Sequence, residues 1–278
     1  MINSSPTQSK AISLNVQVRG KGFPILCLHG HPGSAESMSV FTDRLSQKFQ
    51  TIAPDLRGYG NSRTSRDFEM SDHLQDLEAL LEKFELKQSL LLGWSLGGIL
   101  ALELAIKNPE RFTGLILIAT AARPRGNHPK TTWQDLLFTG LSSMVNQIVP
   151  GWRWNIETFG KRSLYRYLLQ QHTAVAYQHL AREGASAYLQ TSGYARRALA
   201  AALKSRYNRL ADLPQLQLPC LVLAAEGDRH ITAESSLETA RYIPDAGWKC
   251  YANTAHLFPW EIPEQVLEDI EKWIESKL

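Results

Sequence analysis

A serine between two glycines is the first group in this sequence whose surroundings point to chemistry. Residues 93–97 read Gly-Trp-Ser-Leu-Gly. This matches G-x-S-x-G, a pattern that places the serine on a sharp turn between a strand and a helix, with its hydroxyl exposed above the sheet. The apolar run before Ser95 predicts a buried strand, and the run after it has helical spacing. Gly93 and Gly97 relieve the crowded backbone of such a turn. Ser95 is therefore the predicted nucleophile.

The base that Ser95 needs is predicted to be His256. A serine hydroxyl is a weak nucleophile until a base takes its proton, and that base is oriented by a third group. His256 is one of eight histidines, and it lies in a polar turn between the strand-like run 248–252 and the last helix. This position is the carboxyl end of a strand, on the same rim of the sheet as Ser95. His73, by contrast, lies at a predicted helix start.

The third group is predicted to be Asp228. It lies three residues after the end of the apolar run 221–225, so it too lies at the carboxyl end of a strand. Glu226 is a weaker candidate because it is still close to the strand. His230 is too near Asp228 in the chain to bridge that carboxylate to Ser95. A Gly-Asp pair is also common in structural turns, and this remains the competing interpretation.

These residues must be positioned by a sheet, and the chain has the pattern for one. Short continuous apolar runs alternate with segments of helical spacing, which predicts an α/β fold with a mostly parallel, doubly wound sheet. The alternating pattern of residues 12–18 instead predicts an antiparallel edge strand. The buried runs are residues 24–29, 51–54, 89–93, 115–119 and 218–225. A closing helix is predicted from Pro263 to the end of the sequence.

The alternation is interrupted between the last two of these runs. Residues 121–210 have helical spacing but no buried strand, which predicts a helical insertion over the carboxyl end of the sheet. Within 122–210, thirteen Lys and Arg face three Asp and Glu, a net charge of +10, so the rest of the chain carries −7 of the total of +3. Such a segment could steer an anionic substrate, an acyl carrier or an anionic membrane surface, or be a solvated basic face.

Together these features resemble the α/β-hydrolase family, in its serine-nucleophile branch of esterases and cofactor-free perhydrolases. The resemblance covers nearly the whole chain and depends on several motifs in the family's order: His29-Gly30-His31-Pro32-Gly33, the turn from Pro54 to Ser62, the serine turn, and the late acid and histidine. It implies a core of residues 1–120 and 211–278. Residues 121–210 would form a cap that roofs the substrate pocket.

The resemblance also implies roles for individual residues. Ser95, Asp228 and His256 match the family's nucleophile, acid and histidine, in that chain order. The backbone N–H groups of Leu96, directly after the nucleophile, and of His31 would form the oxyanion hole.

Three side chains are predicted to line the substrate pocket: His31, Trp94 and Trp133. For His31 a rim position without a role is an equal alternative. Trp152 and Trp154 accompany Trp133 in the insertion, where aromatic side chains could hold an apolar acyl chain.

The predicted activity is hydrolysis of a carboxylic ester through an acyl-enzyme. Perhydrolase or haloperoxidase, carbon–carbon bond hydrolase, amidase and thioesterase activities use the same three residues, and a non-hydrolytic ligand-binding protein of this fold is a further alternative. A serine rather than an aspartate at position 95 argues against haloalkane dehalogenases and epoxide hydrolases, relatives that use an aspartate.

Composition excludes other classes of function. The three cysteines, Cys27, Cys220 and Cys250, are an odd and widely spaced set, which favours small buried side chains over disulfides or zinc. No phosphate-binding loop or metal-ligand spacing occurs, so neither cofactor nor metal is expected. The sequence has no signal-peptide pattern, no membrane-length apolar run and no nucleic-acid motif. These features predict a cytoplasmic protein. The serine site predicts a small-molecule acyl substrate, and the basic insertion is compatible with an anionic one.

Overall fold

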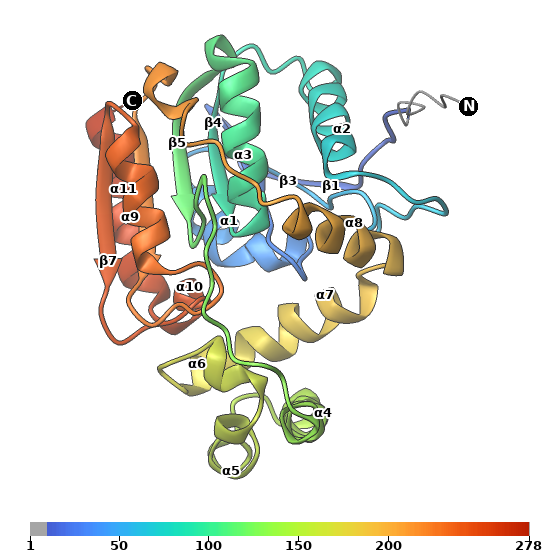
Figure 1. The fold of residues 1–278 in the computed structure, drawn as a ribbon. Helices are drawn as coiled ribbons and strands as arrows, with labels where there is room; N and C mark the ends of the chain where they lie inside the picture. Colours follow the sequence, from blue (N-terminus) through green and yellow to red (C-terminus); the bar gives the residue numbers. More distant parts are fainter. Residues whose placement is uncertain (1–9, 278) are drawn as a thin grey trace.

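The computed structural model of the protein describes residues 10–277, and a seven-stranded sheet runs through it (Figure 1). The strand order is β1-β3-β2-β4-β5-β6-β7, with every neighbouring pair parallel except β1 and β3. The strands are β1 (Val16–Arg19), β2 (Pro24–Leu28), β3 (Gln50–Pro54), β4 (Ser89–Trp94), β5 (Phe112–Ile118), β6 (Cys220–Ala225) and β7 (Ala246–Tyr251). The predicted α/β fold with a mostly parallel sheet is confirmed.

The predicted edge strand is antiparallel but shorter than its pattern. β1 begins only at Val16 and pairs with β3. Before it, the Ile12 N–H donates to Asp76 Oδ1 at 2.7 Å, outside the sheet. An alternating pattern indicates one buried face, but a strand also needs a neighbour to accept its hydrogen bonds, and here a side chain takes that place.

Helices cover both faces of the sheet, as the doubly wound pattern requires (Figure 1). Apolar side chains of α2 and α3 pack in one core cluster, which Ala240 of α9 joins, and those of α1 and α11 in the other. The bounds are α1 (Ser39–Leu45), α2 (Met70–Lys83), α3 (Leu96–Lys107), α9 (Ala233–Tyr242), α10 (Phe258–Glu261) and α11 (Pro263–Lys277). The central strands β4 and β6 are buried along their whole length, which explains their unbroken apolar runs.

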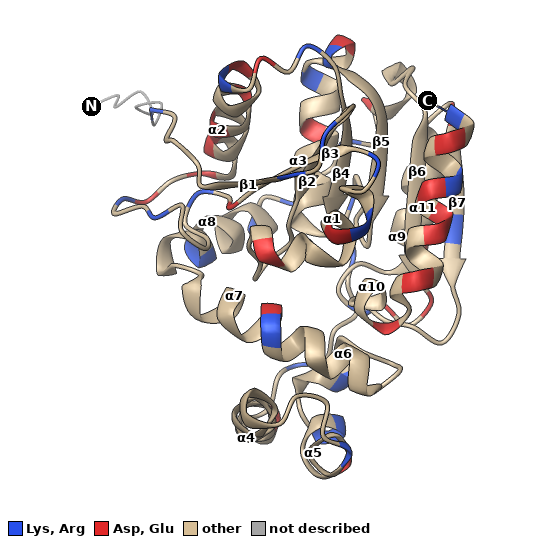
Figure 2. Ribbon diagram, turned by 180° about the vertical axis from the view of Figure 1, so that it is seen from behind, with Lys and Arg blue, Asp and Glu red and all other residues tan. Residues whose placement is uncertain are grey.

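The segment between β5 and β6 is helical, as predicted. It contains α4 (Trp133–Ile148), α5 (Arg153–Thr158), α6 (Ala174–His179), α7 (Ala185–Gln190) and α8 (Gly193–Lys204). A π-helical turn, Leu180–Gly184, joins α6 to α7. Figures 1 and 2 show α6 and α7 next to the core, and α4 and α5 at the end of the molecule farthest from the sheet. We refer to residues 121–210 as the insertion.

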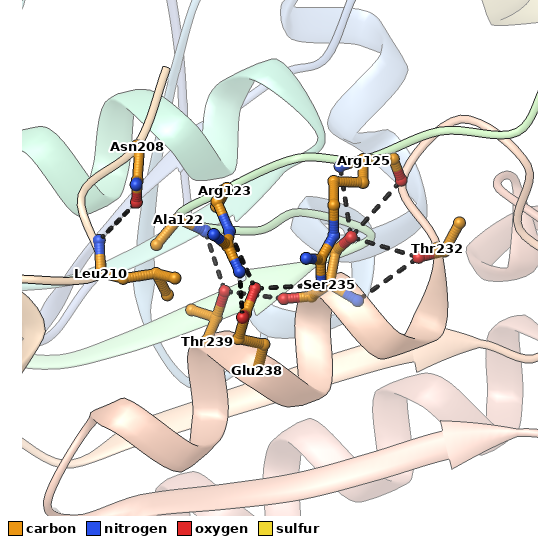
Figure 3. A network of polar contacts seen from close by, with 9 residues as sticks. All are labelled: Ala122, Arg123, Arg125, Asn208, Leu210, Thr232, Ser235, Glu238 and Thr239. Carbon is orange, nitrogen blue, oxygen red and sulfur yellow. Dashed lines mark hydrogen bonds and ion pairs between the residues drawn. The ribbon is translucent and has the colours of Figure 1, made fainter. Parts of the chain in front are cut away.

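Polar contacts hold the start of the insertion against α9 (Figure 3). The Ala122 N–H donates to Thr239 Oγ1 at 2.9 Å. Two arginines that follow, Arg123 and Arg125, both pair with Glu238, the second at 3.1 Å. The chain therefore leaves the core at a fixed point, because three hydrogen-bonded or charged groups hold it to one helix.

The positive charge of the insertion is only partly neutralised. Six of its thirteen cations form ion pairs with described residues: Arg123, Arg125, Lys161, Arg166, Arg197 and Arg209. Within residues 10–277 the other seven form none: Lys130, Arg153, Arg162, Arg182, Arg196, Lys204 and Arg206. All seven of these residues are exposed. Figure 2 marks the positions of Lys and Arg along the ribbon.

One expectation about the cysteines is wrong. Cys27 and Cys220 are free and buried in strands, but Cys250 is free and exposed. It lies on β7, an edge strand of which only Tyr251 is buried, so an apolar neighbourhood in sequence did not bring burial. None of the helices in residues 10–277 combines the length and the apolar character that crossing a membrane requires.

Candidate active site

The turn that carries Ser95 is strained and held in place from several sides. Ser95 has φ 54° and ψ −116°, which a non-glycine residue adopts at a cost of about 1–3 kcal/mol. Its N–H donates to the Ile118 carbonyl at 2.8 Å, and its own carbonyl accepts from Thr120 Oγ1 at 2.9 Å. A Cβ on Gly93 would lie 2.4 Å from the Gly97 carbonyl oxygen, so the turn requires glycine there.

The structure brings together the three residues that were predicted to act on substrate. His256 Nε2 lies 3.1 Å from Ser95 Oγ, across 161 residues of sequence. On the other side of the ring, His256 Nδ1 lies 2.7 Å from Asp228 Oδ2. The Asp228 side chain is almost wholly buried, and His256 is 7% exposed. The imidazole is thus fixed between a hydroxyl and a carboxylate.

The Asp228 carboxylate is oriented by its own loop. Its Oδ1 accepts from the backbone N–H groups of His230 and Ile231, at 2.8 and 3.0 Å, which leaves Oδ2 for His256. Burial, and then the neighbouring His256, lowers the pKa of His230 to about 3, so its ring is neutral. Glu226, the weaker candidate, instead accepts from the Asn253 N–H at 3.3 Å.

The loop after β2 passes directly beside Ser95. A Cβ on Gly30 would lie 3.1 Å from Ser95 Cβ and 3.7 Å from its Oγ. His29 fixes this loop, because its Nε2 accepts the Leu56 N–H at 3.0 Å and burial lowers its pKa to about 4. Across from the loop, Leu96 begins α3, so its N–H has no acceptor within the helix.

The side chain of His31 is held by a residue that the sequence did not single out. His31 Nδ1 lies 2.8 Å from the Tyr59 hydroxyl. Burial, followed by the charge of Arg196, lowers the pKa of His31 to about 4. Burial raises the pKa of Tyr59, against a lowering effect of the Arg196 charge. The Arg196 guanidinium donates to the Tyr188 carbonyl at 3.0 Å and lies over the Tyr188 ring at 4.5 Å, and its positive charge acts on the loop beside Ser95.

A second residue missed from sequence, Glu261, connects the insertion to the His256 loop. Its buried carboxylate accepts the Ala255 N–H at 2.7 Å through Oε1, and the N–H groups of Gln170 and Gln171 through Oε2. Burial raises the pKa of this carboxyl, against the lowering effect of those hydrogen bonds. No local pattern around Glu261 indicates this role, because two of its partners lie about ninety residues earlier.

The two tryptophans predicted for the pocket lie in different surroundings. Trp94 is buried, with its ring edge-on to Phe41 at 6.0 Å and to Trp260 at 5.3 Å. This contact set gives it a packing role. Trp133 lies at the start of α4 and is 70% exposed, and no hydrogen bond or ring contact joins it to the described residues around Ser95.

Comparison with known proteins identifies the family. Residues 24–263 match the model of the alpha/beta hydrolase fold. The chain belongs to this family. The predicted resemblance is thereby confirmed at the level of the family.

Among the residues that the structure describes, no three His, Cys, Asp or Glu side chains are grouped as a metal ion would require.

Relatives within the alpha/beta hydrolase family cover almost the full chain at low identity. The "Uncharacterized hydrolase YugF" of Bacillus subtilis is 26% identical over 264 residues, which are 90% of this chain and 89% of the relative. A 2-hydroxymuconate semialdehyde hydrolase of Pseudomonas putida is 27% identical over 275 residues, 94% and 90% of the two chains. A solved esterase of Thermogutta terrifontis has a TM-score of 0.71 at 26% identity, covering 95% and 93%.

Proposed function

We propose that this protein hydrolyses carboxylic esters through an acyl-enzyme formed on Ser95. The observation that carries the proposal is the unbroken series of contacts from Ser95 Oγ to His256 Nε2, and from His256 Nδ1 to Asp228. A hydroxyl, a base and an orienting carboxylate in this geometry are what nucleophilic acyl transfer needs. The likeness to a solved esterase, at 26% identity, supports the same substrate class.

The reaction would follow in two steps. Ser95 Oγ attacks the ester carbonyl carbon while its proton passes to His256 Nε2. The C–O bond to the alcohol then breaks, and the alcohol leaves with that proton. In the second step His256 takes a proton from water, the hydroxide attacks the acyl carbon, and the carboxylic acid departs as Ser95 regains its proton. Asp228 accepts the Nδ1–H throughout and stabilises the imidazolium.

The negative oxygen of each tetrahedral intermediate would be held by the N–H groups of Leu96 and His31. Leu96 supports this role by beginning α3, where the free N–H groups and the helix dipole favour negative charge. The closeness of Gly30 to Ser95 supports it for the next residue, His31. Two such donors contribute because they are positioned before charge develops.

The substrate is proposed to carry a negative charge, with residues 121–210 as a cap. Arg196 is the observation that favours this class: it has no ion-pair partner within residues 10–277 and lies close enough to His31 to lower its pKa. A substrate carboxylate near Arg196 would be attracted by its positive charge. The rings of His31 and His230 are neutral, so they do not alter this attraction by a charge of their own.

Labelling with a fluorophosphonate probe tests the nucleophile. We expect labelling of the wild-type protein and none of Ser95→Ala, because only an activated serine reacts. Ser205→Ala, which removes an exposed hydroxyl directly after α8, is the matched control and should be labelled fully. A Ser95→Ala protein that keeps label, or ester hydrolysis within about tenfold of wild type, would exclude Ser95.

A series of p-nitrophenyl esters of increasing acyl length tests the reaction class. Carbon–carbon bond hydrolysis is the alternative to separate, because a 2-hydroxymuconate semialdehyde hydrolase is 27% identical over nearly the whole chain. A vinylogous diketone assayed beside the esters makes the distinction. If the diketone is turned over faster than every ester, the function is carbon–carbon bond hydrolysis instead of ester hydrolysis. Ser95, His256 and Asp228 would still be the residues that act.

A further inference from the structure

The outer helix of the insertion exposes an apolar face. On α4, six apolar side chains recur at helical spacing and all are exposed: Trp133, Leu136, Leu137, Leu141, Met144 and Ile148. Trp133, Met144 and Ile148 are 70, 69 and 82% exposed. We call these six residues the α4 face. A surface helix normally turns its apolar residues toward the core, so this arrangement is the reverse of the usual one.

Polar side chains occupy the inner side of α4 instead. Its buried residues are Asp135, Ser142 and Asn146. Asn146 Nδ2 donates to the Tyr177 carbonyl at 2.6 Å, and the Ser142 carbonyl accepts from Asn155 Nδ2 at 2.9 Å. These bonds fix which way the helix faces. The α4 face cannot be turned inward without leaving buried polar groups unpaired, at a large energetic cost.

Aromatic side chains of α5 continue the apolar surface. Trp152 and Trp154 are both about half exposed, and their ring centroids lie 4.9 Å apart. Trp154 packs edge-on against Phe159 at 5.4 Å, and Phe159 stacks on Phe138 of α4 at 6.3 Å. The surface therefore extends from one helix to the next without a break. Apolar patches of this extent on a protein surface mark interaction sites.

The charges around this surface that have no ion-pair partner within residues 10–277 are of one sign. α4 contains no Lys or Arg (Figure 2), and its single acid, Asp135, is buried and paired with Arg166 at 2.7 Å. Exposed cations without an ion-pair partner within residues 10–277 lie on the neighbouring segments: Lys130 before α4, Arg153 between the two tryptophans, Arg162, and Arg182.

The other two acids of the insertion do not offset these cations. Glu157 is paired with Lys161 at 2.7 Å. Glu183 is buried, accepts from Ser39 Oγ at 3.3 Å and lies 3.2 Å from His179 Nδ1. An uncharged apolar centre with an unneutralised basic surround is complementary to a surface that is apolar inside and anionic at its boundary.

We propose that the α4 face and the α5 tryptophans dock on an anionic lipid bilayer. The helix would lie in the plane of the membrane, with its apolar side chains at the boundary of headgroups and acyl chains and the cations on lipid phosphates. α4 and α5 form the end of the molecule farthest from the sheet, so nothing in the core obstructs this approach (Figures 1 and 2). A symmetric dimer through the same surface would instead bring two sets of unpaired cations together.

Sedimentation with lipid vesicles tests the proposal, and Ser95→Ala protein can be used because no step depends on catalysis. We expect binding to phosphatidylglycerol vesicles at low salt, binding at least tenfold weaker to phosphatidylcholine vesicles, and release as salt rises. Met144→Glu/Ile148→Glu should weaken binding to phosphatidylglycerol at least tenfold, because it places charge at the apolar boundary. Arg153→Gln/Arg162→Gln should also weaken it about tenfold.

Matched variants on α8 control for the changes themselves. Leu203 is 67% exposed in the same insertion, and Leu203→Glu should bind within about twofold of the parent protein. Lys204→Gln/Arg206→Gln removes two unpaired cations away from α4 and should have a smaller effect than Arg153→Gln/Arg162→Gln. When the same substitutions are made in the protein that keeps Ser95, hydrolysis of a short water-soluble ester should be unchanged.

Three results would overturn the proposal. The first is an absence of binding to phosphatidylglycerol vesicles, and the second is equal binding by the parent protein and Met144→Glu/Ile148→Glu. The third is a dimer in solution that Met144→Glu/Ile148→Glu converts to monomers, because the α4 face would then be a contact between two copies of the chain.

Discussion

The core and the insertion place polar and apolar side chains in opposite ways. Beneath the sheet rim, apolar strands fill the interior, and the polar groups at their carboxyl ends converge on Ser95. In the insertion, α4 turns polar residues inward and leaves its apolar residues in solvent. Hydrophobic burial therefore organises the first region, whereas hydrogen bonds between helices orient α4 in the second.

This difference separates two tasks. The core holds Ser95 and Asp228 each within hydrogen-bonding distance of His256, which requires a rigid support. The insertion supplies charge near the site through Arg196 and an apolar surface far from it. Substitutions in the core should therefore change the rate of the chemical step, and those in the insertion should change what reaches the site or where the protein binds.

The largest expected effect lies in the core, at Asp228. Asp228→Asn keeps the size of the side chain but offers an amide to His256 Nδ1, which favours the wrong tautomer. We expect kcat for an ester to fall by about three to four orders of magnitude, with KM little changed. Steady-state kinetics measure both. Turnover close to wild type would show that another carboxylate, such as Glu226, orients the ring.

The junction of the two regions is tested at Glu261. Glu261 accepts hydrogen bonds from three backbone N–H groups and so connects the insertion to the His256 loop. Glu261→Gln replaces one of the two accepting oxygens by an amide nitrogen, which cannot accept. The free energy of unfolding should fall by about 1.5–3 kcal/mol, and kcat/KM should fall with it. Glu264→Gln, at an exposed carboxylate paired with Arg44, is the control. Equal effects of the two in denaturant titrations would mean that Glu261 anchors nothing.

Two histidines, His73 buried and His172 half-buried, test the contrast between the polar groups of the two regions. His73 on α2 has no hydrogen-bond partner for either ring nitrogen within the described residues, and burial lowers its pKa to about 3. Below about pH 6.5, His73 is protonated in the unfolded chain but stays neutral in the folded protein. The free energy of unfolding therefore falls as the pH falls. His73→Phe should reduce the loss of unfolding free energy between pH 8 and pH 5 by about 2 kcal/mol.

The counterpart in the insertion is His172, whose Nδ1 lies 2.9 Å from the Tyr177 hydroxyl and whose pKa burial lowers to about 4. His172→Phe should also reduce the pH dependence, but it should cost about 1 kcal/mol at pH 8 through the lost hydrogen bond. Denaturant titrations at both pH values measure this. We expect this loss at pH 8 only for His172→Phe, because of the two only His172 forms a side-chain hydrogen bond within residues 10–277. An equally large loss for His73→Phe would contradict this difference between the two histidines.

The smallest expected effect concerns Arg196. Arg196→Gln should lower kcat/KM for an anionic ester by about threefold to tenfold at low salt and leave a neutral ester of the same size unchanged, with the gap closing as salt rises. Arg197→Gln is the matched control, because the neighbouring arginine pairs with Asp67 instead. Two results would contradict the proposal of an anionic substrate. One is an equal change in kcat/KM for both esters in Arg196→Gln, and the other is an equal change for the anionic ester in Arg196→Gln and Arg197→Gln.

The sequence by itself determined the order of strands and helices, the position of the insertion, and the placement of Ser95, Asp228 and His256 at carboxyl ends of strands. These features could be predicted because each depends on a local pattern: apolar runs, helical spacing, and a serine between glycines. Parallel strands place their carboxyl ends on one edge of the sheet, so local positions were enough to predict that distant residues meet. The length of β1 and the exposure of Cys250 were not predictable in this way, because each depends on a neighbour.

Only the tertiary structure decided which partners the remaining polar groups have. Tyr59 beside His31, and Glu261 beside Gln170, are contacts between segments with no shared pattern. The direction of α4 is the clearest case. Its spacing shows that apolar residues share one face, but the polar partners of Asn146 and Asp135 determine that this face points to solvent. Periodicity defines the faces of a helix, and the energy of the contacts that each face can make decides which one is buried.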